Sequence, residues 1–362
     1  MRKLLLFLLV LPLFSITVQA AEIETIQEDQ FGTAALEDGL PEEAEEMLQG
    51  IDFGDNDFSD GAAQIFSKSM AENRSTLVQA VALAAVVIGV VLLCGTLRTV
   101  HEAEGIQPVA IAGALGITTA CAFGFQAMIQ LGANTVQSLS DYSTLLLPAL
   151  ASSTIASGGV SSGTALYTGT VLFTNVLSAM VSKLLVPMVY LFIGVATANA
   201  AMANHLLDSI RDFISWLIST SLKAILYIFT GYLTISGIIS GSADAASVKA
   251  TKLAIGNMIP VVGGIISDAS ETVLVSASLL KNSIGIFGML AVLAVCVTPL
   301  LRIAIHYLIL KVTKAVCGTV GSKNHVELVG DLSTAMGFLL GMTGTCALML
   351  LISTVCSLRV IG

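Results

Sequence analysis

Long apolar runs separated by short polar stretches dominate the chain. Six of them are continuous enough to predict membrane-spanning helices: residues 77–97, 108–131, 170–196, 213–239, 283–310 and 331–357. Each is close to, or longer than, the roughly 20 apolar residues that a helix needs to cross a bilayer. The pattern therefore predicts an all-α polytopic integral membrane protein.

Two further apolar segments, 142–163 and 250–282, are interrupted by proline, serine and glycine. Non-helical backbone at membrane depth must be buried in protein or line a wet cavity, so these segments either cross or re-enter the membrane. We therefore expect six to eight membrane-embedded helices, some of them interrupted or re-entrant.

Positive charge restricts the topology. The strongest basic cluster is expected at the end of the 283–310 helix and in the loop after it, and it comprises Arg302, Lys311, Lys314 and Lys323. The positive-inside rule places such a cluster in the cytoplasm. Six spans behind an exported N-terminus satisfy the rule, and so do eight, so the two interrupted segments should both cross or both re-enter.

Composition agrees with this class. The chain is 55% hydrophobic and 11% charged, whereas a soluble domain is about one quarter charged. Residues 1–20 have a basic start, a short apolar core and small residues before Ala21, which predicts a cleavable signal peptide. An uncleaved first anchor is the alternative.

Residues 21–76 form a short acidic segment that we expect to be exported. They hold 15 Asp and Glu against Lys68 and Arg74, a net charge of −13. Nucleic-acid binding needs a basic surface, so we do not expect this acidic segment to bind nucleic acid. The stretch "LPEEAEEMLQGI" predicts an amphipathic helix, either simply solvated or a docking surface. Residues 77–362 are then the helical transmembrane domain.

Known catalytic and metal-binding patterns are weak or missing in the sequence. There is no phosphate-binding GxxxxGK[ST] loop, and the four histidines lack ligand spacing. Ser278–Lys281 matches SxxK without its companion motifs. The six cysteines fall in or beside apolar runs, as buried small hydrophobes do. We expect no enzyme activity, no cofactor and no metal.

The most informative polar positions lie in the segment 257–282. Charged groups at membrane depth are costly and face protein or water. The candidate pore-lining or subunit-interface residues are Asp268, Glu271, Ser278, Lys281 and Asn282. The candidate helix break before them comprises Pro260, Gly263 and Gly264. An interfacial amphipathic helix, a helix lining a wet passage or polar interface, and a site for a small solute all fit this pattern.

A second polar patch lies in "NHLLDSIRDFISW", where Asp208 and Asp212 flank Arg211 one turn apart. Acidic residues suit a helix N-terminus, and Asp208 is placed to cap one. The pattern predicts a loop-to-helix entry, with contact to a partner as the alternative.

Several motifs resemble one known family. They are "GN-x-IP" at Gly256–Pro260, "DASETV" at Asp268–Val273 and "SLLKN-x-x-GI" from Ser278, supported by "LLLPALASS" at Leu145–Ser153 and "LPEEAEEML". In these motifs the chain closely resembles stage III sporulation protein AE of endospore-forming bacteria. The 250–290 block is specific, and the rest is a shared order of hydrophobic segments.

The resemblance implies a subunit of a channel or feeding complex between mother cell and forespore, needed for late forespore development. The implied partners are the other subunits of the stage III sporulation A complex, including a cytoplasmic ATPase and ring-forming proteins, and a forespore-made protein. The implied location is the mother-cell-derived membrane around the forespore, with the N-terminal segment in the intermembrane space. A pore or export gate, a non-conducting scaffold and an independent transporter remain as alternatives.

Overall fold

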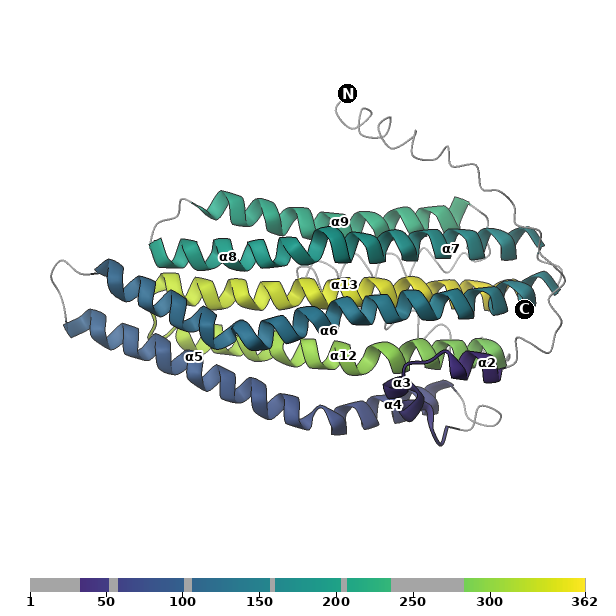
Figure 1. Cartoon of the computed structure of the whole chain (residues 1–362), viewed down its shortest axis with the longest axis horizontal. Helices are drawn as coiled ribbons and strands as arrows, with labels where there is room; N and C mark the ends of the chain where they lie inside the picture. The colour runs from purple at the N-terminus through teal and green to yellow at the C-terminus, as the bar shows by residue number, and fades with distance from the viewer. Residues whose placement is uncertain are drawn as a thin grey trace, which may run out of the picture.

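The computed structural model describes residues 33–51, 58–100, 106–156, 160–202, 207–235 and 283–361. Within these ranges the chain is helical apart from short turns, and no strand occurs. Long antiparallel helices lie side by side in one elongated bundle, and short N-terminal helices pack along one side of it (Figure 1). The predicted all-α class is confirmed.

Six stretches among the described residues are long and apolar enough to cross a membrane, which confirms a polytopic membrane protein. The helices that supply them are α5 (Arg74–Val100), α6 (Ile106–Ala156), α7 (Val160–Met180) with η3 (Val181–Leu185) and α8 (Val186–Met202), α9 (Asp208–Ile235), α12 (Ser283–Cys317) and α13 (Lys323–Ile361). The turn η3 is a π-helical turn that joins α7 to α8 without a break, so these three elements form one rod.

The interrupted segment 142–163 is neither a separate crossing nor a re-entrant loop. Its first part continues α6 through Pro148 up to Ala156, and its last residues begin α7. A proline inside a helix removes one backbone hydrogen bond. Here Leu146 and Leu150, on either side of it, are buried, and the Leu150 carbonyl accepts a hydrogen bond from Ser357 of α13. Packing therefore outweighs the local helix-breaking signal. The other interrupted segment, 250–282, lies outside the described residues, and α12 begins directly after it.

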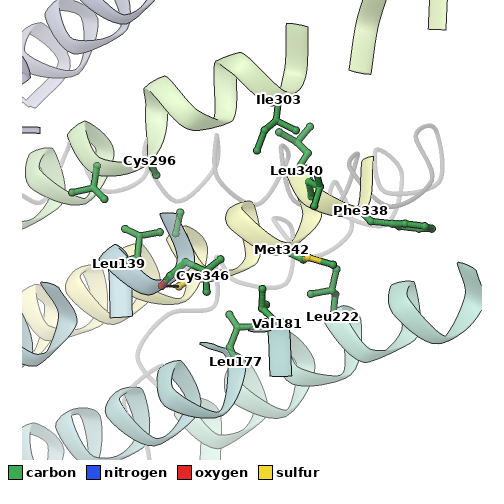
Figure 2. Close-up of a cluster of buried hydrophobic side chains, with 14 of the residues drawn as sticks. Leu139, Leu177, Val181, Leu222, Cys296, Ile303, Phe338, Leu340, Met342 and Cys346 are labelled. Carbon is green, nitrogen blue, oxygen red and sulfur yellow. Dashed lines mark hydrogen bonds between the residues drawn. The ribbon is translucent and has the colours of Figure 1, made fainter. Parts of the chain in front are cut away.

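Helix α13 is the centre of the bundle. Within its span, 94% of the most apolar window is buried, far more than in the outer helices. Figure 2 shows Met342 and Cys346 of α13 facing Leu139 of α6, Val181 of η3 and Leu222 of α9. All six cysteines are buried and free, which confirms their interpretation as small hydrophobic core residues.

Close helix approach depends on small residues at a few positions. At Gly288 of α12, an added Cβ would lie 2.6 Å from Leu146 Cδ1 of α6. At Gly113 of α6, it would overlap the His325 ring of α13. Without a hydrophobic force between helices in lipid, such close contacts supply much of the association energy.

The acidic N-terminal segment packs against the bundle. It forms α2 (Thr33–Asp38), α3 (Glu42–Leu48) and α4 (Phe58–Glu72), all of which contact α12. In α3, Ala44, Met47 and Leu48 are buried and the glutamates are exposed, so the predicted amphipathic helix is confirmed. Lys68 Nζ donates to the carbonyls of Met47 and Gln49, which ties α4 to the end of α3. Residues 1–20 lie outside the described residues.

Candidate functional site

The residues that the sequence singles out in 257–282 lie outside the described part of the chain. They are Pro260, Gly263, Gly264, Asp268, Glu271, Ser278, Lys281 and Asn282. Their assignment to a pore lining or subunit interface stays a prediction.

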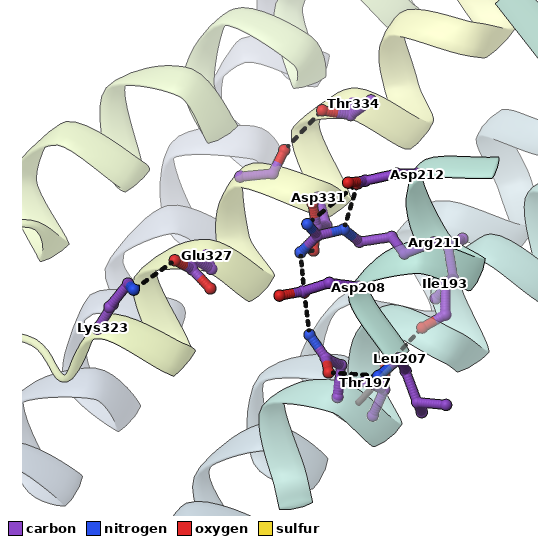
Figure 3. Close-up of polar contacts among 12 residues, drawn as sticks. Ile193, Thr197, Leu207, Asp208, Arg211, Asp212, Lys323, Glu327, Asp331 and Thr334 are labelled. Atoms are coloured by element: carbon purple, nitrogen blue, oxygen red, sulfur yellow. Dashed lines mark hydrogen bonds and ion pairs between the residues drawn. The ribbon is translucent and has the colours of Figure 1, made fainter. Parts of the chain in front are cut away.

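The second predicted patch is described, and it centres on Arg211. Helix α9 begins at Asp208, as the loop-to-helix interpretation predicts. Arg211 Nη1 lies 3.2 Å from Asp208 Oδ1, and its Nη2 lies 3.1 Å from Asp212 Oδ1. Nη1 also lies 3.2 Å from Asp331 Oδ2 on α13. Figure 3 shows the guanidinium surrounded by these three carboxylates.

Asn199 extends this network to α8. Its Nδ2 donates to Asp208 Oδ1 at 2.8 Å, and its Oδ1 accepts from the Leu207 backbone nitrogen at 3.4 Å. Asn199 is buried, and one amide side chain thus satisfies groups on both sides of the α8–α9 connection. The corner between the two helices is fixed by its own side chains as well as by α13.

A small pocket opens beside Arg211. It has about 240 Å³ of empty volume, which includes open solvent. Its lining residues are Ala196, Asn199, Ala200, Arg211, Asn324, Glu327, Leu328 and Asp331. At its rim Glu327 pairs with the exposed Lys323 at 3.7 Å.

Burial decides which of the Arg211 contacts matter. The Arg211 and Asp331 side chains are 17% and 18% exposed, whereas Asp212 is 70% exposed. Removing one partner of a buried pair is costly because the other charge stays unpaired, while exposed pairs contribute little. The Arg211–Asp331 contact is therefore the strongest link between the α8–α9 corner and the central helix.

This arrangement is suited to holding helices together. Among the described residues there is no group of three or more His, Cys, Asp and Glu that could hold a metal ion. The carboxylates around Arg211 are occupied by ion pairs and hydrogen bonds, and no serine, cysteine or histidine lines the pocket. The site is an ion-pair clamp at one end of the bundle.

Sequence reasoning missed Asp331 and Asn199 as members of this site. Asp331 is an acidic residue within a long apolar helix, and such residues are by default paired or functional. This rule marks Asp331 as a candidate. It does not identify Arg211 as its partner, because Arg211 is 120 positions away in the sequence.

A second polar junction corrects the predicted basic cluster. Arg302 does not lie at the end of its helix, because α12 continues to Cys317. Its guanidinium donates to Glu72 of α4 and, at 3.3 Å, to Asn73 Oδ1 at the α4–α5 turn. Ser69 and Thr298 share a 2.9 Å hydrogen bond beside it. Arg302 therefore joins the N-terminal helices to the bundle, and Lys311 and Lys314 lie in the same helix rather than in a loop after it.

Comparison with known proteins agrees with the resemblance. A profile of the family described as stage III sporulation protein AE matches residues 42–359. A relative from Bacillus subtilis (strain 168), named stage III sporulation protein AE, is 21% identical over 229 residues, which are 63% of this chain and 57% of the relative. The matched region thus spans little more than half of that relative. No solved structure matches.

A family match over nearly the whole chain and six membrane-length helices lead to one conclusion: this chain belongs to the stage III sporulation protein AE family of sporulation membrane proteins.

Proposed function

We propose that the chain is a membrane-embedded subunit of the channel complex between mother cell and forespore, and that its described bundle serves there as a packed scaffold. Family membership supports a role in sporulation. The observation that favours a scaffold is the burial of α13, whose side chains fill the axis about which the other helices pack. A passage along that axis would require removing α13 from its neighbours.

The scaffold has two regions suited to recruiting partners. The acidic faces of α2 and α3 are exposed, and α4 anchors them to α12 through Glu72 and Arg302. The clamp around Arg211 holds the opposite end of the bundle. A rigid body with fixed ends is what ring-forming and ATPase subunits would need on the two sides of a membrane.

The second candidate is a pore or export gate assembled together with other chains. It is favoured by the sequence of 257–282, where Asp268, Glu271 and Lys281 interrupt an apolar stretch. In that case the wet path would run beside the packed bundle rather than through it.

Substitution of the two carboxylates separates these candidates. The variant Asp268→Asn/Glu271→Gln is expressed in sporulating cells, and both co-purification with the sibling subunits and forespore gene expression are measured. A gate predicts intact co-purification with impaired forespore expression. A scaffold predicts either no effect or loss of both. Uptake of solute by vesicles that contain this chain alone would instead favour an independent transporter.

A further inference from the structure

Helix α6 carries a row of polar side chains on its outer surface. Eight of its residues between Gln126 and Leu145 are exposed, and six of them are polar. We name these six residues the polar stripe: Gln126, Gln130, Asn134, Gln137, Asp141 and Thr144. Because they recur every three or four residues, they lie along one side of the helix. Figure 1 shows α6 on the outside of the bundle, between the α7–α8 rod and α5.

The fold satisfies the hydrogen bonds at only one end of the stripe. Gln137 Oε1 accepts a hydrogen bond from Ser178 Oγ of α7 at 2.9 Å, and Gln137 Nε2 donates to Asp141 Oδ1 at 2.8 Å. The three amides before Gln137 have no side-chain hydrogen bond to another described residue. Their donors and acceptors are therefore available to a group outside the fold of one chain.

Hydrogen bonds give the height of the stripe relative to the α7–α8 rod. Thr118 of α6 bonds Thr197 at one level. Gln137 bonds Ser178 at another level. Because α6 and the rod run in opposite directions, residues 171–189 of the rod are level with the stripe.

The stripe interrupts a belt of exposed apolar side chains. Phe173 of α7 contacts Phe229 of α9 at a ring-centroid distance of 5.5 Å, so residues 213–231 of α9 lie at the same height. Large apolar side chains are exposed there on both elements: Leu172, Val176 and Leu184 on the rod, and Trp216, Tyr227 and Ile228 on α9. Single polar residues also occur at this height, including Lys183 and Lys223, whose apolar stems can extend along the helix. Among the described helices at this height, α6 alone presents a row of exposed amides.

An apolar belt suits lipid, and an unpaired amide does not. Acyl chains offer no hydrogen-bond partner, so each amide left in contact with them costs free energy. Between membrane helices, Asn and Gln side chains remove this cost by hydrogen bonding across the contact. The stripe is therefore a surface that needs a polar cover.

We propose that the polar stripe of α6 is the surface through which two copies of this chain associate in the membrane. A primary amide both donates and accepts hydrogen bonds, so a row of amides complements a second copy of itself. Both copies have the same orientation and depth in the bilayer, so a two-fold axis along the membrane normal sets each amide opposite its equivalent. From Gln130 to Thr144 the intervals alternate between four and three residues, the spacing at which two helices pack along a seam. Such a pair is compatible with either a scaffold or a gate.

Cysteine cross-linking in phosphatidylethanolamine–phosphatidylglycerol vesicles locates the contact. The six native cysteines are buried, so one added exposed cysteine reports on its own surroundings. The matched control is Tyr227→Cys, because Tyr227 is 71% exposed at the same height on α9. With copper phenanthroline as oxidant, we expect Asn134→Cys to form disulfide-linked dimers at least about fivefold faster than the control.

Equal rates at the two positions would mean random collision and would overturn the proposal. Absence of cross-linking at Asn134→Cys would overturn it as well. Labelling of that cysteine by an aqueous maleimide would then indicate water along the stripe, and protection from the reagent would indicate a different cover.

Energy transfer between copies labelled at the C-terminus with donor and acceptor dyes measures the strength of association. We expect Gln130→Leu/Asn134→Leu to weaken it at least about tenfold, because leucine fills the space of an amide but forms no hydrogen bond. Tyr227→Leu should leave it unchanged. Unchanged association of the double variant would overturn the proposal. Monodisperse elution and continued protection of the buried cysteines verify that each variant is folded.

Asp141 distinguishes a second copy from a partner with a cation. In a pair of identical copies the two Asp141 carboxylates approach each other, and like charges repel. Asp141→Asn should therefore tighten the association measured by energy transfer. A weaker association would mean that a lysine or arginine of a different partner faces Asp141, and it would overturn the proposal.

Discussion

Arg211 Nη1 on α9 and Asp331 Oδ2 on α13 lie 3.2 Å apart, although 120 positions separate them in sequence. This contact joins the N-terminus of an outer helix to the helix at the centre of the bundle. Asn199 adds α8 to the same network through Asp208. Three helices are thus held at one end by a single guanidinium and its partners.

Removing the guanidinium should destabilise the bundle more than removing one exposed partner. We expect Arg211→Ala to lower the free energy of unfolding by about 2 kcal/mol, between the values for exposed and fully buried pairs, because Asp331 is left partly buried and unpaired. Unfolding in mixed micelles by increasing SDS measures this. Asp212→Asn is the control and should change stability by less than about 0.5 kcal/mol, since Asp212 is mostly exposed. Equal effects of the two variants would contradict the ranking.

The Glu72–Arg302 pair should control how firmly the N-terminal helices are attached. Glu72→Arg alone places two cations together, and we expect faster proteolysis between α4 and the bundle. Combining it with Arg302→Glu restores opposite charges and should recover most of the protection. Limited proteolysis in detergent measures both. The matched control is Glu327→Arg, which breaks the more exposed pair with Lys323 and should leave the N-terminal helices protected.

A methyl group at Gly113 should cost stability. The added Cβ would overlap the His325 ring and lie 2.8 Å from Cys94 Sγ, so α5 and α13 would both have to move. Overpacking of this kind costs about 1–3 kcal/mol, which Gly113→Ala should show in the same unfolding assay. At Gly89 of α5 nothing lies within 4 Å of the added Cβ, so Gly89→Ala should be neutral or slightly stabilising. Loss of stability at both positions would point to a general intolerance of larger residues.

The cysteines should be protected in the folded protein. All six are buried, so a hydrophilic maleimide should modify fewer than one thiol per chain in detergent within the time that modifies all six in SDS. Intact-mass spectrometry counts the adducts. Rapid modification of Cys346, at the centre of the bundle, would show that water enters the core and would weaken the scaffold proposal.

Local sequence patterns predicted most of the helices correctly, but they predicted the wrong helix boundary at two places. At Pro148 the sequence indicates a break in the helix, because a proline inside a helix removes one backbone hydrogen bond and local reasoning sees nothing that compensates for it. Contacts of Leu146 with α12 and of Leu150 with α13 keep α6 continuous. After Arg302 the sequence predicts that the helix ends at residue 310, and the structure extends it to Cys317. In both cases packing between distant segments extends a helix beyond its local signals.

The candidate site shows the same division. Asp208 at the start of α9 could be predicted, since capping and helix-dipole effects act within one turn. The partner Asp331 could not, because nothing in either neighbourhood specifies which helices pack together. The candidates in 257–282 stay predictions.

The sequence by itself determined the all-α membrane class, the six continuous apolar runs, the acidity of the N-terminal segment and the family resemblance. These properties depend on the composition and order of residues, and a bilayer favours the helix for long apolar runs because their backbone groups must be paired internally. Only the tertiary structure decided that α13 is central, that Arg211 reaches Asp331 and that Arg302 reaches Glu72. Those relationships depend on how helices are paired and offset along their axes, and such offsets are set by close packing between residues far apart in the chain.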